Sequence, residues 1–432
     1  MAFSLWDVPE SSLVETLSGL QMRDILAATS CDRKCLHAAQ SISHLPAISK
    51  TSFKVLSLRP FASRFPKLNS INAYMEGDWV PDYADALTIS GRLVRKLVVR
   101  LGEGIGETEL RVIVKGCPSL YGFELTDYDL IGNVDITGEF LKDLPPSLVE
   151  LRLCLLRSLD DASLMACAEV CPCLQMVSLE GNDDLSSRGF QALADLQLRD
   201  LTLVCTRAGI GQITEETLIR ILDGTAPSLR ALEVSERAGP PLELQGGGIN
   251  LVTFVARHRF LETLSLSGVV GLGNEALRSL ALGCPLLRDL NLYRPGSQLT
   301  SSGLQDAFPN FASLEVLSLG CVADFWGAFQ AVKASPLRTL EMTRYFRSAA
   351  QVSLLSVLRH LQNDFPSLSN ASFRGTFSAE QVVACRSTME LQSCPDVQWT
   401  HLDEQTFGVE WFRGEDCVSV QLQRCFKEGE FI

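Results

Sequence analysis

A short pattern of leucines, L-x-x-L-x-L, recurs along this chain and limits the folds that it can adopt. Between residues 261 and 319 the pattern starts at Leu261, Leu287 and Leu314, so the copies are 26 and 27 residues apart. The copies are separated by turn-forming residues and an apolar run read as helical, Leu277, Leu280 and Leu282. Each copy therefore predicts one strand followed by one helix. Because one copy cannot bury its own apolar face, neighbouring copies must stack.

A period of this length with this pattern is typical of leucine-rich repeats. We therefore expect an α/β leucine-rich repeat solenoid, a horseshoe built as a right-handed β-α superhelix, with strands on the concave side and helices on the convex side. Long spacings indicate insertions, and the glycines and prolines of residues 236–248 predict a loop. The strand patterns start at Val94, Leu120, Leu148, Leu174, Leu198, Leu229, Leu261, Leu287, Leu314, Leu337 and Leu368.

The repeat unit between Leu277 and Leu292 carries a Gly-Cys-Pro step, Gly283 to Pro285, before its leucine pattern. This arrangement resembles the cysteine-containing subtype of leucine-rich repeat, which is common in F-box/LRR proteins. The chain has 14 cysteines, and Cys167, Cys171 and Cys173 lie close together in the sequence. No histidine or second cysteine pair at zinc-finger spacing accompanies them. We therefore expect free, buried thiols and no metal site.

Residues 1–50 lack the leucine pattern. Their apolar residues recur at helical spacing, which predicts a small unit of two or three short helices. This segment resembles an F-box: Val8-Pro9 stands for its opening pair and Arg23-Asp24-Ile25-Leu26 for its Arg-Asp-Leu-Leu step. The usual tryptophan is missing, with Cys35 at or beside its place. The alternative is a helical cap that shields the first repeat from solvent, which solenoids need.

The F-box resemblance implies that these helices dock a Skp-type adaptor of a cullin complex. The residues that match the adaptor-binding positions are Pro9, Leu13, Leu17, Leu20 and Ile25.

The remaining sequence outside the regular repeats divides into two regions. Residues 51–92 contain two short leucine patterns only 15 residues apart, which predicts truncated first repeats and an insertion before the regular repeats of residues 93–375. Residues 376–432 lose the pattern and carry a net charge of −6 from ten acidic and four basic side chains. Alternation in 408–412 and 418–422 predicts short strands. We expect a C-terminal cap, with a partner-binding acidic tail as the alternative.

Composition excludes several function classes. The net charge of −13 disfavours binding to the phosphates of nucleic acids. No apolar run reaches the roughly 20 residues of a membrane helix, and the N-terminus does not resemble a secretory signal. No nucleophile, phosphate-loop or metal-ligand motif was found, so we expect neither an enzyme nor a cofactor. His258 and His360 each follow or precede an arginine in a helical context, and we expect both on the surface.

Any function must therefore depend on surface residues that bind a partner. In L-x-x-L-x-L the residue between the last two leucines is expected to point to the concave side, and so is the residue that follows the last leucine. Tyr293, Arg294, Phe325, Trp326, Tyr345 and Phe346 come just after successive strand patterns. For Phe325 and Trp326 the alternative is that they begin a helix and pack in the core. The predicted target-binding residues are Arg152, Glu180, Tyr293, Arg294, Trp326 and Tyr345.

The resemblance implies a substrate-recognition subunit of an SCF-type cullin–RING E3 ubiquitin ligase, in the cytoplasm or nucleus. The adaptor would dock on the N-terminal helices, and a target protein marked for degradation would dock on the concave face. The alternative is a leucine-rich repeat scaffold or inhibitor with no link to ubiquitin. The target protein, and any small molecule in the horseshoe, cannot be named from the sequence.

Overall fold

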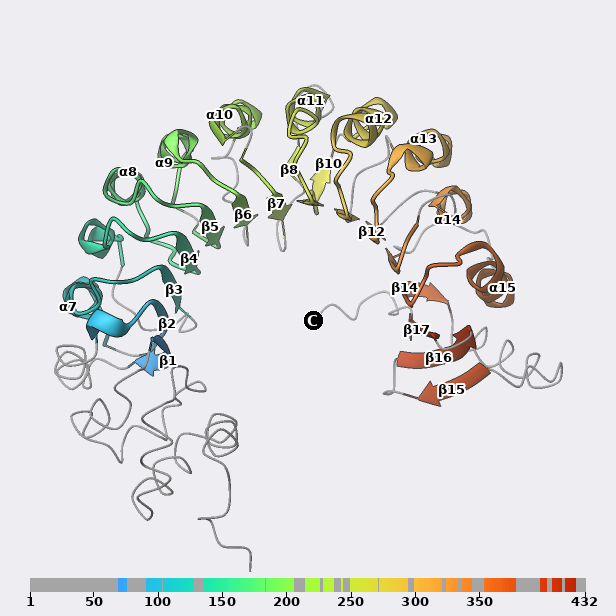
Figure 1. Ribbon diagram of the computed structural model, residues 1–432, viewed down its shortest axis with the longest axis horizontal. Helices are drawn as coiled ribbons and strands as arrows, with labels where there is room; N and C mark the ends of the chain where they lie inside the picture. Colours follow the sequence, from blue (N-terminus) through green and yellow to red (C-terminus); the bar gives the residue numbers. More distant parts are fainter. Residues whose placement is uncertain are drawn as a thin grey trace, which may run out of the picture. The chain divides into compact units, whose positions relative to one another are not determined.

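The computed structural model describes residues 69–75, 91–102, 104–127, 136–182, 184–205, 214–225, 228–236, 242–243, 249–270, 272–293, 299–320, 324–332, 336–343, 353–377, 397–401, 406–413 and 416–424. The predicted adaptor-binding residues of segment 1–50 lie outside these ranges. The chain divides into two compact units, and the boundary passes through β6 (Asp200–Cys205) and α10 (Glu215–Thr225). Figure 1 labels the helices and strands.

The first unit contains five parallel strands in the order β1-β2-β3-β4-β5. A helix or a 3-10 helix follows each strand from β2 onward. The elements are β1 (Ser70–Met75), η3 (Gly91–Leu93), β2 (Lys96–Leu101), α7 (Glu107–Lys115), β3 (Gly122–Asp127), η4 (Glu139–Asp143), β4 (Glu150–Cys154), α8 (Asp161–Val170), β5 (Met176–Glu180), α9 (Ser187–Gln191) and η5 (Ala192–Asp195).

The second unit continues the same alternation. Its parallel strands run in the order β7-β9-β11-β12-β13-β14, and β8 pairs separately with β10. The elements are β7 (Ala231–Glu236), β8 (Leu242–Glu243), α11 (Ile249–Val255), β9 (Thr263–Ser265), β10 (Val269–Val270), α12 (Asn274–Gly283), β11 (Asp289–Tyr293), α13 (Ser301–Ala307), η7 (Phe308–Asn310), β12 (Val316–Gly320), α14 (Phe325–Val332), β13 (Thr339–Thr343), α15 (Leu354–Asp364), β14 (Asn370–Phe377), β15 (Val397–His401), β16 (Thr406–Arg413) and β17 (Asp416–Arg424).

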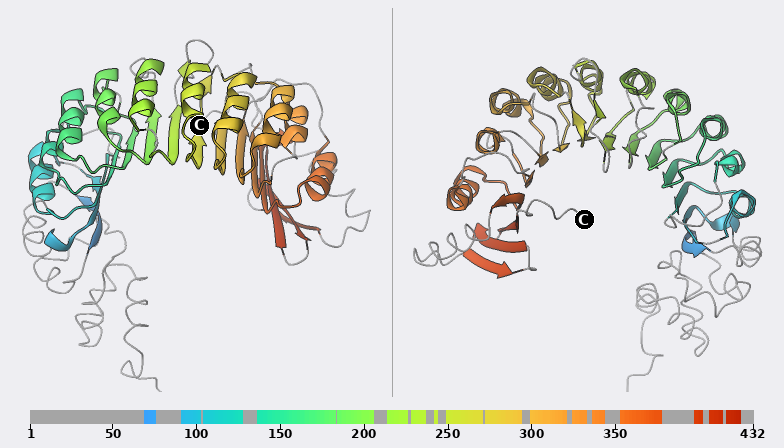
Figure 2. Two further views of the ribbon diagram at one scale, coloured as in Figure 1. Left: turned by 45° about the horizontal axis from the view of Figure 1, so that its top comes forward. Right: turned by 180° about the vertical axis from the view of Figure 1, so that it is seen from behind.

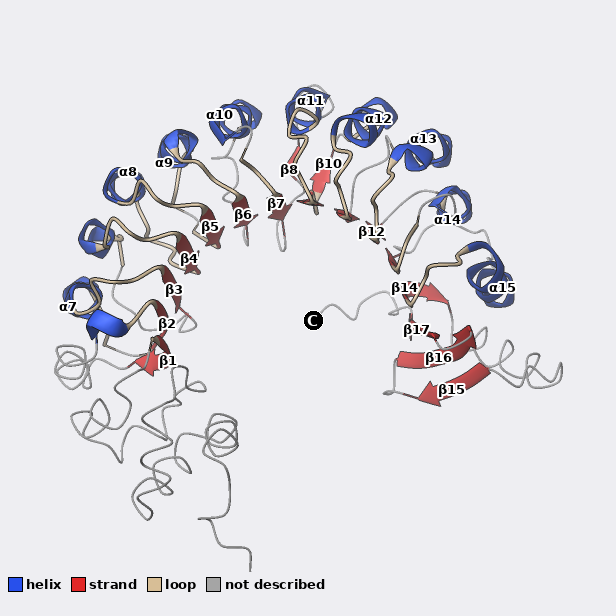
Figure 3. Cartoon of the chain, in the orientation of Figure 1, coloured by secondary structure: helices blue, strands red, loops and turns tan. Residues whose placement is uncertain are grey.

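The leucine pattern places the strands as predicted. Each of the eleven strands of the regular repeats begins two residues after its predicted start, as β4 does at Glu150 after Leu148 and β11 at Asp289 after Leu287. The pattern leucines of the repeats that contain β4 and β11 are only 0–1% exposed. In each unit the helices cover the sheet face that holds these leucines (Figure 3). The fold is therefore the predicted α/β leucine-rich repeat solenoid.

The helices bury a narrow stripe. The predicted helical run of Leu277, Leu280 and Leu282 is confirmed, since all three lie in α12. Leu277 and Leu280 are 3% and 1% exposed, whereas Leu282 is 65% exposed. Residue 282 lies five positions after Leu277, and 3.6 residues per turn carry it away from the buried side of the helix. The predicted loop 236–248 was only partly right, since it contains the two-residue strand β8.

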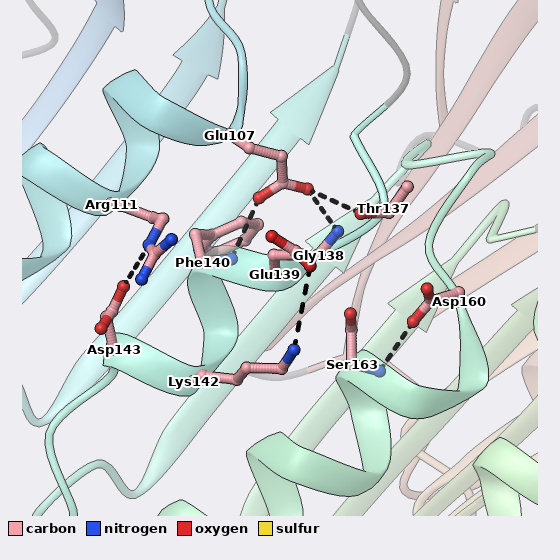
Figure 4. A network of polar contacts seen from close by, with 10 residues as sticks. All are labelled: Glu107, Arg111, Thr137, Gly138, Glu139, Phe140, Lys142, Asp143, Asp160 and Ser163. Atoms are coloured by element: carbon pink, nitrogen blue, oxygen red, sulfur yellow. Dashed lines mark hydrogen bonds and ion pairs between the residues drawn. The ribbon is translucent and has the colours of Figure 1, made fainter.

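Polar side chains in the first turn of one helix tie it to the start of the next repeat's helix. The carboxylate of Glu107 accepts hydrogen bonds from the backbone N–H groups of Gly138 (2.6 Å) and Phe140 (3.0 Å), at the start of η4 (Figure 4). These N–H groups have no partner within their own helix. Asp161 of α8 accepts in the same way from the backbone N–H of Ser186, just before α9, at 2.8 Å.

The same contact recurs in the second unit. The Asn274 side chain of α12 accepts a hydrogen bond from the Thr300 backbone N–H at 3.0 Å and donates to the Thr300 hydroxyl at 2.9 Å. Glycine makes room for it, since a Cβ on Gly303 would lie 2.0 Å from the Asn274 side chain. We call these contacts, made by Glu107, Asp161 and Asn274, the inter-repeat caps.

The predicted buried thiols are confirmed at four of the described cysteines, whereas Cys173 is exposed and Cys154 and Cys205 are half-buried. Cys117, Cys167, Cys171 and Cys284 are free and buried, and burial raises the pKa of Cys117 and Cys284 to about 12. The prediction that His258 lies on the surface was wrong. Its side chain is 3% exposed, and its ring Nε2 lies 3.0 Å from the Leu222 carbonyl oxygen. The neighbouring repeat supplies this partner, which a local sequence pattern cannot reveal.

The predicted C-terminal strands are confirmed as parts of β16 and β17. β17 pairs in parallel with β14, while β16 and β15 follow in antiparallel pairing. The last repeat strand is thus followed by a three-stranded end to the second unit's sheet (Figure 2). The domain boundaries at residues 50, 92 and 375 stay predictions.

Candidate protein-binding surface

In each unit, the sheet face away from the helices carries the side chains of alternate strand residues. Equivalent residues of neighbouring strands form a row across this face. We call this surface the strand face. Pairing in register aligns equivalent residues, such as Glu124 with Arg152 and Asn291 with Ser318. In the first unit it consists of Lys96, Val98, Arg100, Gly122, Glu124, Thr126, Glu150, Arg152, Cys154, Met176, Ser178 and Glu180. In the second unit it includes Ala231, Glu233, Thr263, Ser265, Asp289, Asn291, Tyr293, Val316, Ser318, Gly320, Thr339, Glu341 and Thr343.

An ion-pair cluster crosses three strands of the first unit. Lys96 Nζ of β2 lies 3.0 Å from Glu150 Oε2 of β4, and Arg152 Nε lies 2.8 Å from Glu150 Oε1. Gly122 of β3 stands between Lys96 and Glu150 in the row, and a Cβ there would lie 3.2 Å from Glu150 Oε2. The missing side chain of Gly122 therefore leaves space for a bridge between strands that are not neighbours.

The surroundings of Glu150 favour its charged form. Burial raises the pKa of this carboxyl, but the hydrogen bonds and positive charges of Lys96 and Arg152 outweigh burial and hold its pKa below the ordinary value. The predicted target-binding residue Arg152 thus also has a structural contact, while its side chain stays 48% exposed.

Glu150→Gln is expected to lower the free energy of unfolding at pH 7 by about 1–3 kcal/mol, because two charge-assisted contacts are lost. The folded-state pKa is depressed, so the carboxylate's contribution is present above the ordinary carboxyl pKa and is lost as the pH falls through the folded value. Urea unfolding of both proteins from pH 7 downward measures the difference, which should shrink below about pH 4.3.

The matched control is Glu139→Gln, which removes a 58% exposed carboxylate whose ion pair with Lys142 is 4.0 Å long. It should change stability by less than about 0.5 kcal/mol. A stability difference for Glu150→Gln that stays constant with pH would contradict the assigned role.

The strand face of the second unit holds an aromatic platform. A Cβ on Gly320 would lie 2.3 Å from the ring of Tyr293, so this ring lies over the glycine of the adjacent strand. The Tyr293 backbone N–H donates to Asn291 Oδ1 at 3.1 Å. Tyr293, a predicted target-binding residue, is thereby held in place and is half-buried. A fixed aromatic side chain of this kind contributes strongly to protein interfaces.

Carboxylates lie on both sides of this platform. Ser318 donates its hydroxyl to Glu341 Oε2 at 3.2 Å, and Ser235 donates to Glu233 Oε1 at 2.9 Å. Burial, and then the negative charge of Glu341, raise the pKa of Asp289. The second unit therefore presents hydroxyl, amide and carboxylate groups around Tyr293, while the carboxylate of Glu150 in the first unit is neutralised by its own cations.

The other predicted target-binding residues are placed as follows. Glu180 ends β5 and is half-buried on the strand face of the first unit. Trp326 lies in α14, in accord with the alternative that it begins a helix, and its ring stacks on Phe329 at 5.6 Å and against His360 at 5.2 Å. The structure thus does not bring Trp326 to the strand face. Arg294 and Tyr345 lie outside the described residues.

Sequence reasoning missed Lys96, Glu150 and Asp289. They occupy the first strand position, two residues after the start of the leucine pattern, whereas the strand residues predicted to bind the target came only from the third and fifth strand positions. Because side chains alternate along a strand, the first position faces the same side and was open to the same reasoning. Among the described residues, no cluster of His, Cys, Asp or Glu has the arrangement of a metal site. None of the described helices has the length and apolar character that crossing a membrane requires.

Comparison with known proteins adds a sequence relationship. The bovine (Bos taurus) F-box/LRR-repeat protein 4 is 26% identical over 227 residues, which cover 51% of this chain and 35% of that protein. The chain resembles the F-box/LRR proteins. It spans about a third of the length of this relative. No family model matches the chain.

Several solved structures match the chain at low sequence identity. The yeast Rad7 and Elc1 complex includes a chain that matches with 16% identity and a TM-score of 0.45, over 86% of this chain and 85% of that one. The TLR13–ssRNA13 complex matches with 15% identity and a TM-score of 0.44, over 78% and 44%. LegL7 of Legionella pneumophila matches with 15% identity and a TM-score of 0.35, over 59% and 85%.

Proposed function

We propose that this leucine-rich repeat protein is a substrate-recognition subunit of an SCF-type cullin–RING E3 ubiquitin ligase. The observation that carries the proposal is its similarity to F-box/LRR-repeat protein 4, whose name joins the two modules predicted from this sequence. In this role the chain catalyses nothing itself. It holds a target protein near a ligase that other subunits provide, in the cytoplasm or the nucleus.

The two contacts of such a subunit fall on different parts of the chain. Pro9, Leu13, Leu17, Leu20 and Ile25 are proposed to dock the Skp-type adaptor through the ridge of apolar side chains that F-boxes use. The strand face is proposed to bind the target. In the first unit it offers the exposed Arg152, and in the second unit it offers carboxylates around the fixed ring of Tyr293. Arginine and aromatic side chains of this kind are enriched in protein interfaces. We keep Glu180, Arg294 and Tyr345 as further target-binding candidates, whereas Trp326 lies in α14 and away from the strand face.

The test of adaptor docking is a pulldown of the full chain with a purified Skp-type adaptor. Wild type is compared with the double variant Leu17→Asp, Leu20→Asp, which puts two charges on the proposed apolar contact. Circular dichroism and urea unfolding establish whether the variant is folded. The matched control is Gln21→Asp, which adds a negative charge at a polar residue next to Leu20 in the sequence.

Adaptor binding by wild type and Gln21→Asp, with loss in the folded double variant, is the result we expect. If wild type fails to bind, the first fifty residues act as a helical cap, and the protein is a non-catalytic leucine-rich repeat scaffold or inhibitor. Binding that survives the double substitution would contradict the proposed contact residues.

A further inference from the structure

Three large apolar side chains stand in solvent at one place in the second unit. Phe260 is 45% exposed, Leu282 65% and Leu286 42%. They are the exposed large hydrophobic residues of this unit among the residues that the structure describes. All three belong to the two successive repeats whose helices are α11 and α12, which lie side by side in Figures 1 and 2. Single exposed apolar residues are common on protein surfaces, but neighbouring ones indicate a contact site.

Phe260 and Leu286 occupy the same turn in these repeats. Phe260 lies three residues before Thr263, and Leu286 lies three residues before Asp289. Thr263 and Asp289 are paired in the neighbouring strands β9 and β11. The turn is closed by the same backbone hydrogen bond, from Leu261 N–H to His258 O (2.9 Å) in one repeat and from Leu287 N–H to Cys284 O (3.1 Å) in the next. The Arg288 N–H donates to the Glu262 carbonyl at 2.8 Å and joins the two segments. The two side chains are therefore neighbours across the repeat boundary.

The other repeats supply an internal comparison. At this turn position most of them carry a small or polar residue, namely Ser119, Ser147, Cys173, Gln197, Ser228, Ser313, Pro336 and Ser367. The serine has a structural role, since Ser147 donates to the Leu120 carbonyl at 3.2 Å and Ser313 to the Pro285 carbonyl at 2.9 Å. Phe260 and Leu286 give up this hydrogen bond and expose apolar surface instead. The repeat fold does not require either residue.

The rim of this apolar surface is basic, although the whole chain has a net charge of −13. Arg230 together with residues 256–262 and 278–288 supply five arginines and one glutamate. The guanidinium of Arg230 lies 4.9 Å from the centre of the Phe260 ring and 3.5 Å from Glu262. The other arginines of these segments are Arg257, Arg259, Arg278 and Arg288, and all four are exposed. The guanidinium of Arg288 lies 3.8 Å from the carboxylate of Glu315. An acidic partner fits this rim, and a basic one would be repelled.

We propose that Phe260, Leu282 and Leu286, with their arginine rim, form a docking surface for an acidic segment of a partner protein that carries apolar side chains. The apolar side chains of the partner bury the three exposed residues, and its carboxylates pair with the arginines. This surface belongs to the turns and the helix end and is separate from the strand face, so it does not depend on the proposed ligase function. Phe260, stacked under Arg230, is expected to contribute most to binding.

The test uses the full chain and a labelled synthetic peptide that places leucines three and four residues apart among glutamates. A second peptide has every glutamate replaced by lysine. Fluorescence anisotropy measures the Kd of each peptide at two salt concentrations. The variant Phe260→Ser, Leu286→Ser restores the residue that other repeats carry at this position and is therefore expected to fold. Val112→Ser, which changes a 41% exposed residue of α7 in the first unit, is the control.

We expect the glutamate peptide to bind wild type and the control equally, to weaken with salt, and to bind the double serine variant at least about tenfold more weakly. The lysine peptide should not bind. Equal binding of both peptides, no binding of the glutamate peptide, or an unchanged Kd in the double serine variant would each overturn the proposal. Sedimentation velocity tests whether a second copy of this chain occupies the surface instead. If wild type self-associates and the double serine variant is monomeric, the acidic partner is ruled out in favour of a second copy of this chain.

Discussion

Phe329→Ala is expected to lower the free energy of unfolding by about 3–5 kcal/mol. Phe329 of α14 is 1% exposed. Its ring centre lies 5.4 Å from that of Phe365, 5.6 Å from Trp326 and 6.1 Å from Phe373. Phe329 and Trp326 lie in α14, Phe365 directly follows α15, and Phe373 lies in β14, so one side chain joins two successive repeats to the sheet. Its removal leaves a cavity that rigid aromatic neighbours cannot fill.

Urea unfolding followed by circular dichroism measures this loss. Phe260→Ala is the matched control, because the same residue type in the same unit is 45% exposed and contacts the Arg230 guanidinium. The control should cost about 1 kcal/mol or less. Similar losses for the two variants would mean that the aromatic cluster around Phe329 does not stabilise the repeats as its burial implies.

Gly283→Ala is expected to destabilise the protein by about 2 kcal/mol, although alanine is the better helix former. Gly283 ends α12, and a Cβ there would lie 2.1 Å from the backbone oxygen of Ala256, which follows α11. A backbone oxygen cannot move aside as the end of a flexible side chain can, so α12 must shift away from α11. Helix propensity alone would instead stabilise the variant by up to about 1 kcal/mol.

The sign of the stability change in Gly283→Ala therefore shows whether close packing of α12 against α11 or the helix propensity of alanine has the larger effect. Thermal and urea unfolding give the change in stability, and Leu282→Ala is the control because it alters the same helical turn at a 65% exposed position. Leu282→Ala should change stability by less than about 0.5 kcal/mol. A Gly283→Ala protein as stable as wild type would show that the two helices are not held at the distance described.

The sequence was sufficient to predict the fold because the leucines alternate with polar residues inside each strand. A shift of one residue would turn Leu151 and Leu153 out of the core, so the pattern determines both the strand and its register. Contacts between repeats were harder to predict. Glu150 reaches Lys96 only because Gly122 leaves space between them, and His258 is buried only because Leu222 of the preceding repeat offers a carbonyl.

The candidate surface was predicted in part. Two of the three strand-face positions were identified, including Arg152 and Tyr293, but the first position was overlooked. Trp326 was assigned to the same surface because it follows a strand closely in sequence. The helix that begins at Phe325 instead places the half-buried Trp326 against Phe329 and His360. Proximity in sequence to a strand end does not determine which side of the repeat a residue occupies.

The inter-repeat caps act in one direction along the chain. Glu107, Asp161 and Asn274 each supply acceptors to backbone N–H groups of the repeat that follows. Deleting the following repeat leaves a carboxylate or amide that water can solvate, whereas deleting the preceding repeat leaves N–H donors without their acceptor. The array should therefore tolerate shortening from its C-terminal end better than from its N-terminal end. During synthesis on the ribosome, each of the three repeats that follow Glu107, Asp161 and Asn274 emerges next to one that already holds the acceptor for the start of its helix.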